Sequence, residues 1–269
     1  MKRYIRHSMK LIIFTTVIVT ISLGVAIWFR YISVLSPKVP ANNKIALNNE
    51  NSNSKLTSEQ KITEQPNPIV PTFDNSKYSI TDPSSIWVIV NKQHPLISAS
   101  YIPVDLTTTV GATISNNAVP DFTAMNSAAL AVGINFTIVS SYRSFDTQNY
   151  LYNNYVATYG QAASDTFSAR PGYSEHQTGL TVDLGSSTGS ECNLDDCFST
   201  TTEGQWLSNH ANEFGFILRY PSDKTSITGY KSEPWHFRYI GRDLAIKMKN
   251  SSITTLEEFF NISGGETYL

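Results

Sequence analysis

The sequence has little charge of either sign. Of its 269 residues 16% are Asp, Glu, Lys or Arg, and the formal net charge is -2. Without an excess of basic residues, no surface of the protein can neutralise a run of phosphates. We therefore expect no nucleic-acid partner.

Cysteine is almost absent. The two cysteines, Cys192 and Cys197, lie close together in the stretch ECNLDDCF, which is typical of a loop. A pair this close, without further soft ligands, makes a poor zinc knuckle and favours a small disulfide-closed loop. Such a disulfide would indicate an oxidising compartment. Two free thiols in a surface loop are the alternative.

One long segment contains no charge. Residues 11–29, LIIFTTVIVTISLGVAIWF, follow a basic stretch and are long enough to cross a hydrocarbon core of about 30 Å. A cleaved signal peptide is the alternative, but its apolar run is normally shorter and followed by small residues, whereas Trp28 and Phe29 end this one. We predict a cytoplasmic tail at 1–10 and an uncleaved transmembrane anchor at 11–29.

The rest of the chain divides into a tether and a folded domain. Residues 30–76 are rich in Asn and Pro and lack apolar periodicity, so we predict a disordered, flexible linker. From residue 77 onward strand and helix patterns mix without a regular βαβ repeat. This texture predicts an α+β domain over 77–269, with a mainly antiparallel central sheet flanked by helices. The expected strands are a short one within 87–96 that ends in a turn at Pro95, 134–144 and 216–220. The expected helices are 120–133, 145–160 and 204–215.

The stretch PGYSEHQTGLTVDLG, residues 171–185, carries the first chemical signal. On one helix His176 and Asp183 would be separated by a rise of about 10.5 Å, too far to share a metal ion comfortably. Gly179 and the β-branched run after it also argue against a helix. We expect a turn that holds His176 and a strand that brings Asp183 back beside it.

A third ligand is needed, and His236 is the best candidate. His7 precedes the anchor, His94 lies in a turn without an acidic neighbour, and His210 lies in an amphipathic helical pattern. His236 lies in SEPWHFRYIG, three residues after Glu233.

Two histidines and one aspartate can bind zinc and leave one position open for water, which a nearby carboxylate such as Glu233 can deprotonate. The pattern predicts metal-assisted hydrolysis of a peptide bond.

Four stretches, VNKQHPL (90–96), SSYRS (140–144), PGYSEHQTGLTVDLG (171–185) and EPWHFRYIG (233–241), resemble the zinc D-alanyl-D-alanine carboxypeptidases of the VanY type, relatives of the VanX dipeptidases. The resemblance covers roughly residues 84–245. It implies Zn²⁺ as cofactor and peptidoglycan stem peptides as substrate. It also implies roles for seven residues: zinc ligands His176, Asp183 and His236, Glu233 as general base and acid, Arg143 polarising the scissile carbonyl and stabilising the oxyanion, and substrate contacts from Arg143, Ser174 and Gln148.

Two points depart from the family pattern or lie outside it. Thr181 stands where family members usually have alanine. The acyl-side pocket varies within the family, so the sequence leaves open whether the bond cleaved is D,D or L,D. Because stem peptides lie outside the cytoplasmic membrane, the resemblance also implies a single-pass membrane protein with its catalytic domain facing out.

Two other classes of function are compatible with the same residues. One is a zinc-stabilised module that binds wall peptides or a protein without cleaving them; Hedgehog signalling domains, which resemble this fold, show that a zinc site alone does not prove catalysis. The other is a membrane-anchored signalling ectodomain without a metal. Glu233 favours the hydrolase, since a binding module has no need of a base beside the metal.

Overall fold

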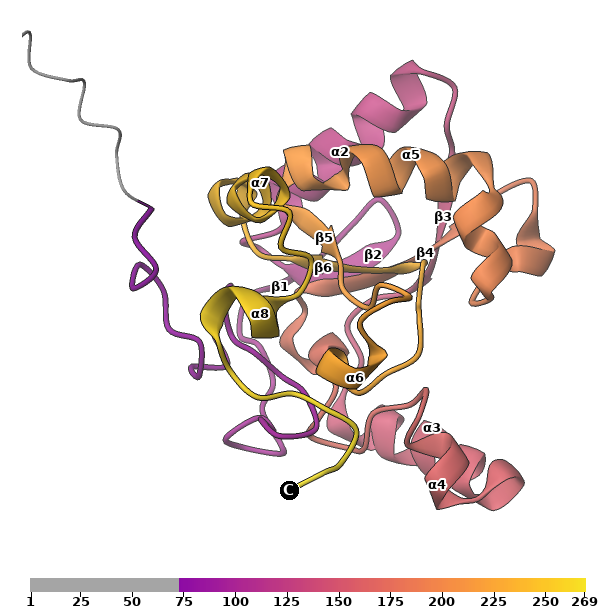
Figure 1. Cartoon of the computed structure of the whole chain (residues 1–269). Coiled ribbons are helices and arrows are strands. Elements are labelled where there is room, and N and C mark those ends of the chain that lie inside the picture. Colours follow the sequence, from indigo (N-terminus) through magenta and orange to yellow (C-terminus); the bar gives the residue numbers. More distant parts are fainter. Residues whose placement is uncertain (1–72) are drawn as a thin grey trace, which may run out of the picture. The chain divides into compact units, whose positions relative to one another are not determined.

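The computed structural model describes residues 73–269, which form an α+β domain (Figure 1). This confirms the predicted fold class. The strands are β1 (Leu106–Thr109), β2 (Ala112–Ser115), β3 (Phe136–Ser140), β4 (Thr181–Ser186), β5 (Phe216–Leu218) and β6 (His236–Tyr239). The helices are α2 (Val119–Ala131), α3 (Phe145–Tyr159), α4 (Gln161–Ser164), α5 (Thr202–His210), α6 (Thr225–Thr228), α7 (Arg242–Asn250) and α8 (Leu256–Phe260). Short 3₁₀ turns complete the order: η1 (Glu175–Thr178), η2 (Ser190–Cys192), η3 (Asp196–Thr200) and η4 (Ala211–Phe214).

The strands form a β1–β2 hairpin and a four-stranded antiparallel sheet in the order β3-β4-β6-β5. The two central strands, β4 and β6, place Asp183 directly opposite His236. On its other side Asp183 lies opposite Ser140, the last residue of β3. The middle of the sheet therefore gathers three segments that are far apart in the sequence.

The main core fills the space between this sheet and the helices on one of its faces. Figure 1 shows α2, α5 and α7 together on that side, above the sheet in this view. Phe122 and Met125 of α2 and Leu207 of α5 pack in one buried cluster with Val182 and Leu184 of β4. Because side chains alternate along a strand, this packing turns Asp183 toward the opposite face.

Most of the expected elements are found, with shifted ends. The helices expected at 120–133 and 145–160 are α2 and α3, and the one at 204–215 is α5 continued by η4. The strands expected at 134–144 and 216–220 are the shorter β3 and β5. Residues 141–144 leave the sheet after β3 and run to the start of α3, which places Arg143 in a loop.

The strand expected at 87–96 is wrong. The run does alternate, with Val88 in one hydrophobic cluster and Ile89 in the other, yet it forms no strand in the described chain. Two carbonyl groups of this segment bind a side chain instead of a neighbouring strand. Arg238 Nη2 donates hydrogen bonds to the carbonyl oxygens of Ile86 (3.1 Å) and Val88 (2.8 Å). Apolar alternation indicated which side chains would be buried but could not reveal what the backbone polar groups would bind.

Four charged side chains form a buried ionic network beneath the sheet. Arg219, Arg238, Glu175 and Glu257 are each 2% exposed or less. Arg219 donates two hydrogen bonds to Glu257, from Nη1 (2.9 Å) and Nη2 (2.7 Å), and one from Nε to Glu175 (2.8 Å). Arg238 Nη1 donates to the same Glu175 oxygen at 2.8 Å. Buried charges of this kind persist only when paired, and each one here is paired.

The two cysteines form a disulfide, as their spacing predicts. The loop that they close is fixed to the end of β4, where the Asn193 side-chain oxygen accepts a hydrogen bond from the backbone N–H of Ser186 at 2.8 Å. Gly185 makes room for this contact, because a Cβ built there would lie 2.5 Å from the same oxygen. The loop is therefore held next to the strand that carries Asp183.

The predicted tail at 1–10, the anchor at 11–29 and nearly all of the linker at 30–76 lie outside the described residues. Within residues 73–269, no helix has the length and hydropathy needed to cross a bilayer. The three N-terminal segments thus stay predictions.

We expect Glu257→Gln to lower the free energy of unfolding at pH 7 by about 3–5 kcal/mol, because it leaves Arg219 with one buried counter-charge in place of two. Burial opposes ionisation of Glu257, but Arg219 and the Asn91 amide hold its pKa below the ordinary value. A depressed carboxyl pKa stabilises the fold above the unfolded-state pKa of about 4.3, and this contribution is lost as the pH falls through the folded-state value. Urea unfolding from pH 7 to pH 3 should therefore show a smaller loss of stability for the variant than for the parent. Asp223→Asn, on an exposed carboxylate, is the matched control, and equal pH dependence in both variants would contradict the prediction.

Candidate metal centre and active site

His176 is held by a short turn and one backbone hydrogen bond. It lies in η1, and its Nδ1 is 2.7 Å from the carbonyl oxygen of Ser141. Because a carbonyl oxygen only accepts, Nδ1 must carry the proton, and Nε2 is left with a free lone pair. Nε2 is 3.1 Å from Asp183 Oδ2. The turn thus presents the ring in the tautomer that a metal ligand needs.

Gly179 allows the chain to pass from this turn into β4. Its φ is +70°, in the left-handed region that side chains rarely adopt. A Cβ at this position would lie 2.7 Å from Leu106 Cδ2 and 3.1 Å from the backbone nitrogen of Ser115. The reversal between His176 and Asp183 is therefore as tight as the sequence predicted, with a 3₁₀ turn followed by a strand.

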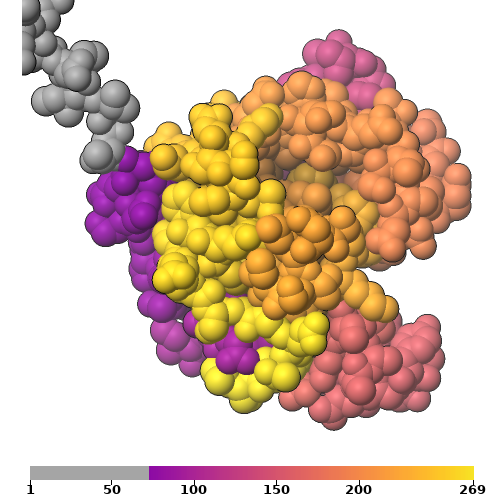
Figure 2. Space-filling model, in the orientation of Figure 1, coloured from indigo at the N-terminus to yellow at the C-terminus, as the bar shows by residue number. Residues whose placement is uncertain are grey.

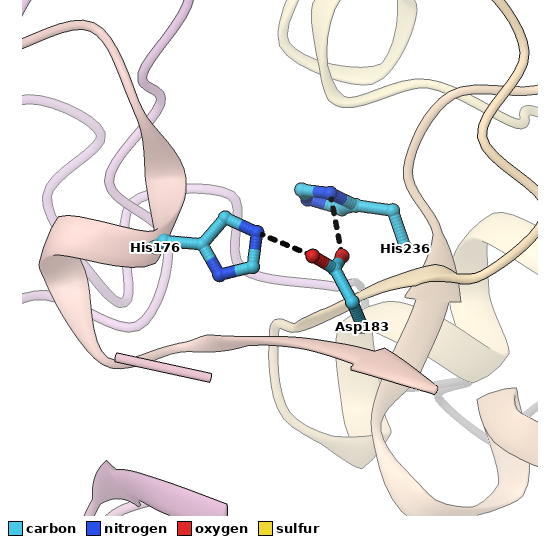
Figure 3. A group of neighbouring side chains, drawn as sticks. All are labelled: His176, Asp183 and His236. Atoms are coloured by element: carbon cyan, nitrogen blue, oxygen red, sulfur yellow. Dashed lines mark ion pairs between the residues drawn. The ribbon is translucent and has the colours of Figure 1, made fainter. Parts of the chain in front are cut away.

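His236 completes the group from the neighbouring strand. Its Nδ1 is 3.2 Å from Asp183 Oδ1, and one donor atom from each of the three residues lies within 4.8 Å of the others. Figure 3 shows the two imidazole rings reaching the Asp183 carboxylate from different sides. All three residues are buried. The structure brings together the three residues that the sequence put forward as ligands.

The three donors fit a zinc ion. Tetrahedral zinc with bonds of about 2.0–2.1 Å sets its ligand atoms roughly 3.3 Å apart, close to the contacts at Asp183. Asp183 Oδ1 is buried and accepts no hydrogen bond from the described residues. Two carboxylates, Asp183 and Glu233, lie within 3.2 Å of the His236 ring and supply the negative charge that a cation site needs. A divalent cation satisfies both the free oxygen and the charge.

The electrostatic surroundings shift the pKa values of the three donors in different directions. Burial opposes ionisation of Asp183, but the two histidines hold its pKa well below the ordinary value, so it is a carboxylate. Burial, followed by the positive charge of Arg143, lowers the pKa of His176, so its ring is neutral. Burial acts the same way on His236, yet its three acidic neighbours outweigh it and raise the pKa well above the usual range.

Glu233 lies beside the donor group but outside it. Its Oε2 is 3.1 Å from His236 Nδ1. Pro234 follows it, and a turn in which the His236 N–H bonds the Glu233 carbonyl at 3.0 Å precedes β6, so the two residues escape strand alternation. Burial raises the pKa of Glu233, and the contact with His236 opposes this. A carboxyl group with a raised pKa can accept and return a proton near neutral pH.

A pocket of about 460 Å³ opens beside this group. Arg143, Gln148, Ser174 and Glu233 all line it, so the structure brings every predicted site residue to one cavity. In Figure 2 the molecule is hollowed between the pink segment with α3 and α4 and the orange segments. Tyr155 of α3 is on the pink side of the pocket lining.

Two of these side chains carry unused polar atoms. Arg143 Nη2 is 4.0 Å from Asp183 Oδ2, and its buried Nε has no hydrogen-bond partner within residues 73–269. Gln148 donates from Nε2 to the carbonyl oxygen of Ala169 at 2.6 Å, which leaves its buried Oε1 unpaired in the same part of the chain. A donor and an acceptor are thus available to a molecule bound in the pocket.

The other described histidines lie elsewhere, as predicted. His94 Nδ1 is 3.0 Å from Asn91 Oδ1 in a turn. His210 stacks on Trp206 and lies 3.0 Å from Glu213 at the surface. His7 lies outside the described residues.

Sequence reasoning missed several residues of the site. Tyr220 packs edge-on against the His236 ring with centroids 4.7 Å apart, and Trp235 lines the pocket. Asp195 of the disulfide loop lines it as well. Glu175 Oε2 lies 3.7 Å from His236 Nε2. A signal for Glu175 was present, because a charged residue inside a buried motif needs a buried partner.

Comparison with known proteins agrees with this geometry. The family described as "VanY: D-alanyl-D-alanine carboxypeptidase" matches residues 111–242. YodJ of Bacillus subtilis (strain 168) is 37% identical over 193 residues, which make up 68% of this chain and 69% of that protein.

Two solved structures share the fold as well as the sequence. The LdcB LD-carboxypeptidase, whose structure concerns peptidoglycan recognition, is 36% identical with a TM-score of 0.61, covering 67% of this chain and 88% of that one. A vancomycin-resistance D,D-pentapeptidase VanY, solved as a mutant in complex with Zn(II), is 37% identical with a TM-score of 0.55, covering 65% of this chain and 98% of that one. The buried His176, Asp183 and His236 group matches the zinc chemistry of such relatives. The chain belongs to the VanY family of D-alanyl-D-alanine carboxypeptidases and is a zinc metallopeptidase.

Proposed function

We propose that this protein removes the C-terminal D-alanine from peptidoglycan stem peptides, with a preference for a D,D bond. The observation that carries the proposal is that Glu233 and Arg143 line one pocket with His176, Asp183 and His236. A binding module would need the three donors only. A carboxylate of raised pKa next to them serves proton transfer, so the binding-module and metal-free alternatives have less support.

Each residue then has a defined task. His176 Nε2, an Asp183 oxygen and His236 Nδ1 would hold the ion, which supplies a water of lowered pKa and polarises a carbonyl group. The Glu233 carboxylate accepts the proton of the attacking water and passes it to the leaving amine nitrogen. The Arg143 guanidinium, with an unpaired N–H, stabilises the negative charge that develops on the scissile carbonyl oxygen.

Substrate contacts follow from the unused polar atoms. Gln148 Oε1 is a buried acceptor and fits an amide N–H of the peptide. Ser174, at the start of η1 next to the metal group, lines the same pocket and contacts the terminal residue.

The D,D preference is supported by the family description and by the VanY pentapeptidase, while the LdcB relative has L,D activity. The chirality of the penultimate residue is therefore the main variable for the test.

We also propose the location of the enzyme. The uncharged run at 11–29 anchors a single-pass membrane protein, residues 1–10 face the cytoplasm, and the linker at 30–76 carries the peptidase domain at 77–269 to the wall outside. A substrate that lies outside the membrane supports this arrangement. The disulfide between Cys192 and Cys197 supports it as well, because such bonds persist in oxidising compartments.

Asp183→Asn should abolish tight zinc binding, since it removes the one anionic ligand. The loss should exceed the roughly 10–100-fold that follows removal of an outer-shell partner. The measurement is zinc content after dialysis, followed by titration against a chromophoric chelator. His210→Ala, at an exposed histidine, is the control and should keep its zinc. Tight binding by the Asp183 variant would contradict the ligand assignment.

Glu233→Gln should keep zinc but lower kcat by about 10²–10⁴-fold, the range for a lost general base. The assay incubates the full-length protein with pentapeptide and tetrapeptide stems and identifies the released amino acid by mass. We expect D-alanine from the pentapeptide. Glu213→Gln, at the surface, is the control with full activity. Release from the tetrapeptide alone would replace D,D with L,D cleavage, and an active Glu233→Gln would contradict the assignment of the base.

The full-length chain should sediment with membranes, and a chain lacking residues 1–29 should not, because the only predicted anchor is gone. Protease added to intact wall-free cells should digest the folded domain of the full-length protein. A soluble or protected full-length protein would contradict the proposed location.

A further inference from the structure

Glu175 precedes the ligand His176 in the sequence but faces the other histidine. Its carboxylate is buried, and one of its oxygens is fully used, since Oε1 accepts hydrogen bonds from Arg219 Nε and Arg238 Nη1, both at 2.8 Å. The second oxygen, Oε2, is also buried and accepts none from any described residue. A buried carboxylate oxygen without a donor is uncommon and calls for an explanation.

A matching unpaired atom lies next to it. His236 Nε2 is buried, has no hydrogen-bond partner within residues 73–269, and is 3.7 Å from Glu175 Oε2. The other ring nitrogen, Nδ1, faces Asp183 and Glu233 on the pocket side. If Nδ1 gives its lone pair to a metal ion, the proton of the ring must be on Nε2, where the available acceptor is Glu175.

We propose that Glu175 is a positioning residue for the zinc centre, which accepts the Nε2–H of His236 and thereby fixes the tautomer and the plane of that ligand. The inference rests on the zinc site but not on the substrate or the bond cleaved. A shift of less than 1 Å closes the present 3.7 Å gap to hydrogen-bond length. Tyr220, edge-on to the same ring at 4.7 Å between centroids, limits the ring's movement.

Arg219 and Arg238 hold the Glu175 carboxylate in its buried position. Two guanidinium groups bind Oε1, so the side chain cannot rotate without losing two charge-assisted hydrogen bonds. Arg219 is in turn held by both oxygens of Glu257. Glu257 accepts a further hydrogen bond from Asn91 Nδ2 at 2.9 Å. Asn91, in the stretch VNKQHPL, thus helps to hold the buried arginine network in place.

The variant Glu175→Gln separates the proposed orientation of the His236 ring from the packing of residue 175, because an amide has nearly the same shape as a carboxylate. The two arginine donors require the oxygen of the introduced amide on their side. The amide NH₂ group would then face the Nε2–H of His236, and two donors cannot form a hydrogen bond. Glu257→Gln is the matched control, because it removes a carboxylate from the same arginine network without touching His236. Both variants should lose stability, and only the first should lose zinc affinity.

The experiment measures the zinc dissociation constant of the full-length parent and both variants by competition with a chromophoric chelator. Urea unfolding and near-ultraviolet circular dichroism establish that the variants are folded at the temperature used. We expect Glu175→Gln to bind zinc about 10–100-fold more weakly than the parent, the range for a lost outer-shell partner, and Glu257→Gln to bind it like the parent. Equal zinc constants in the two variants, whether changed or unchanged, would overturn the proposal.

If Glu175→Gln does not fold, Glu175→Asp replaces it. The shorter side chain keeps the negative charge for the arginines and withdraws the second oxygen from His236, so zinc binding should again weaken relative to Glu257→Gln. Zinc binding like that of Glu257→Gln would overturn the proposal. Because the readout contains no substrate, a wrong assignment of the cleaved bond would leave this result unchanged.

Discussion

The antiparallel pairing of β4 with β6 is the constraint on which the site depends. It puts Asp183 and His236 at opposite positions of one ladder, so two of the three donor atoms are fixed by backbone hydrogen bonds. The third, His176, arrives through one tight reversal at Gly179. A register slip of one residue would turn Asp183 into the main core and remove it from its partners, because side chains alternate along a strand.

Buried charge ties this site to the core. A domain with few charged residues buries Arg219 and Arg238 under its central sheet, where each satisfies several acceptors. Arg238 binds the carbonyl groups of Ile86 and Val88, which lie outside the strands, and both arginines hold Glu175. Removing one member would leave the others uncompensated in a medium of low dielectric constant. The network thus explains both the unusual path of residues 86–90 and the support under His236.

The pocket is built from the central sheet and from segments outside it. The donor group and Glu233 lie on or next to strands of the central sheet. The outer walls come from α3 and from the loop closed by the disulfide at Cys192. Relatives with D,D and with L,D activity share this family and fold. The same fold thus accompanies cleavage of either bond in those proteins.

Local features made much of the domain predictable. Ser144 caps α3 and Gly160 ends it, and Pro120 and Asp121 begin α2, so the helices could be placed to within a few residues. Strand ends were less accurate, because where β3 stops depends on its partner β4 and not on its own residues. The segment at 87–96 was assigned wrongly for the same reason, since its partner is an arginine side chain.

By itself the sequence determined the α+β class and pointed to His176, Asp183, His236 and Glu233 as a group, because residue type, spacing and resemblance to a family set these expectations. Only the tertiary structure decided which nitrogen of each histidine faces the others, that Gln148 and Arg143 keep unpaired atoms in the pocket, and that Glu175 lies under His236. The physical reason is that hydrogen-bond partners of buried polar atoms come from segments distant in the chain. The distances between these partners depend on the pairing of the strands in the folded sheet, and a local sequence pattern does not contain that information.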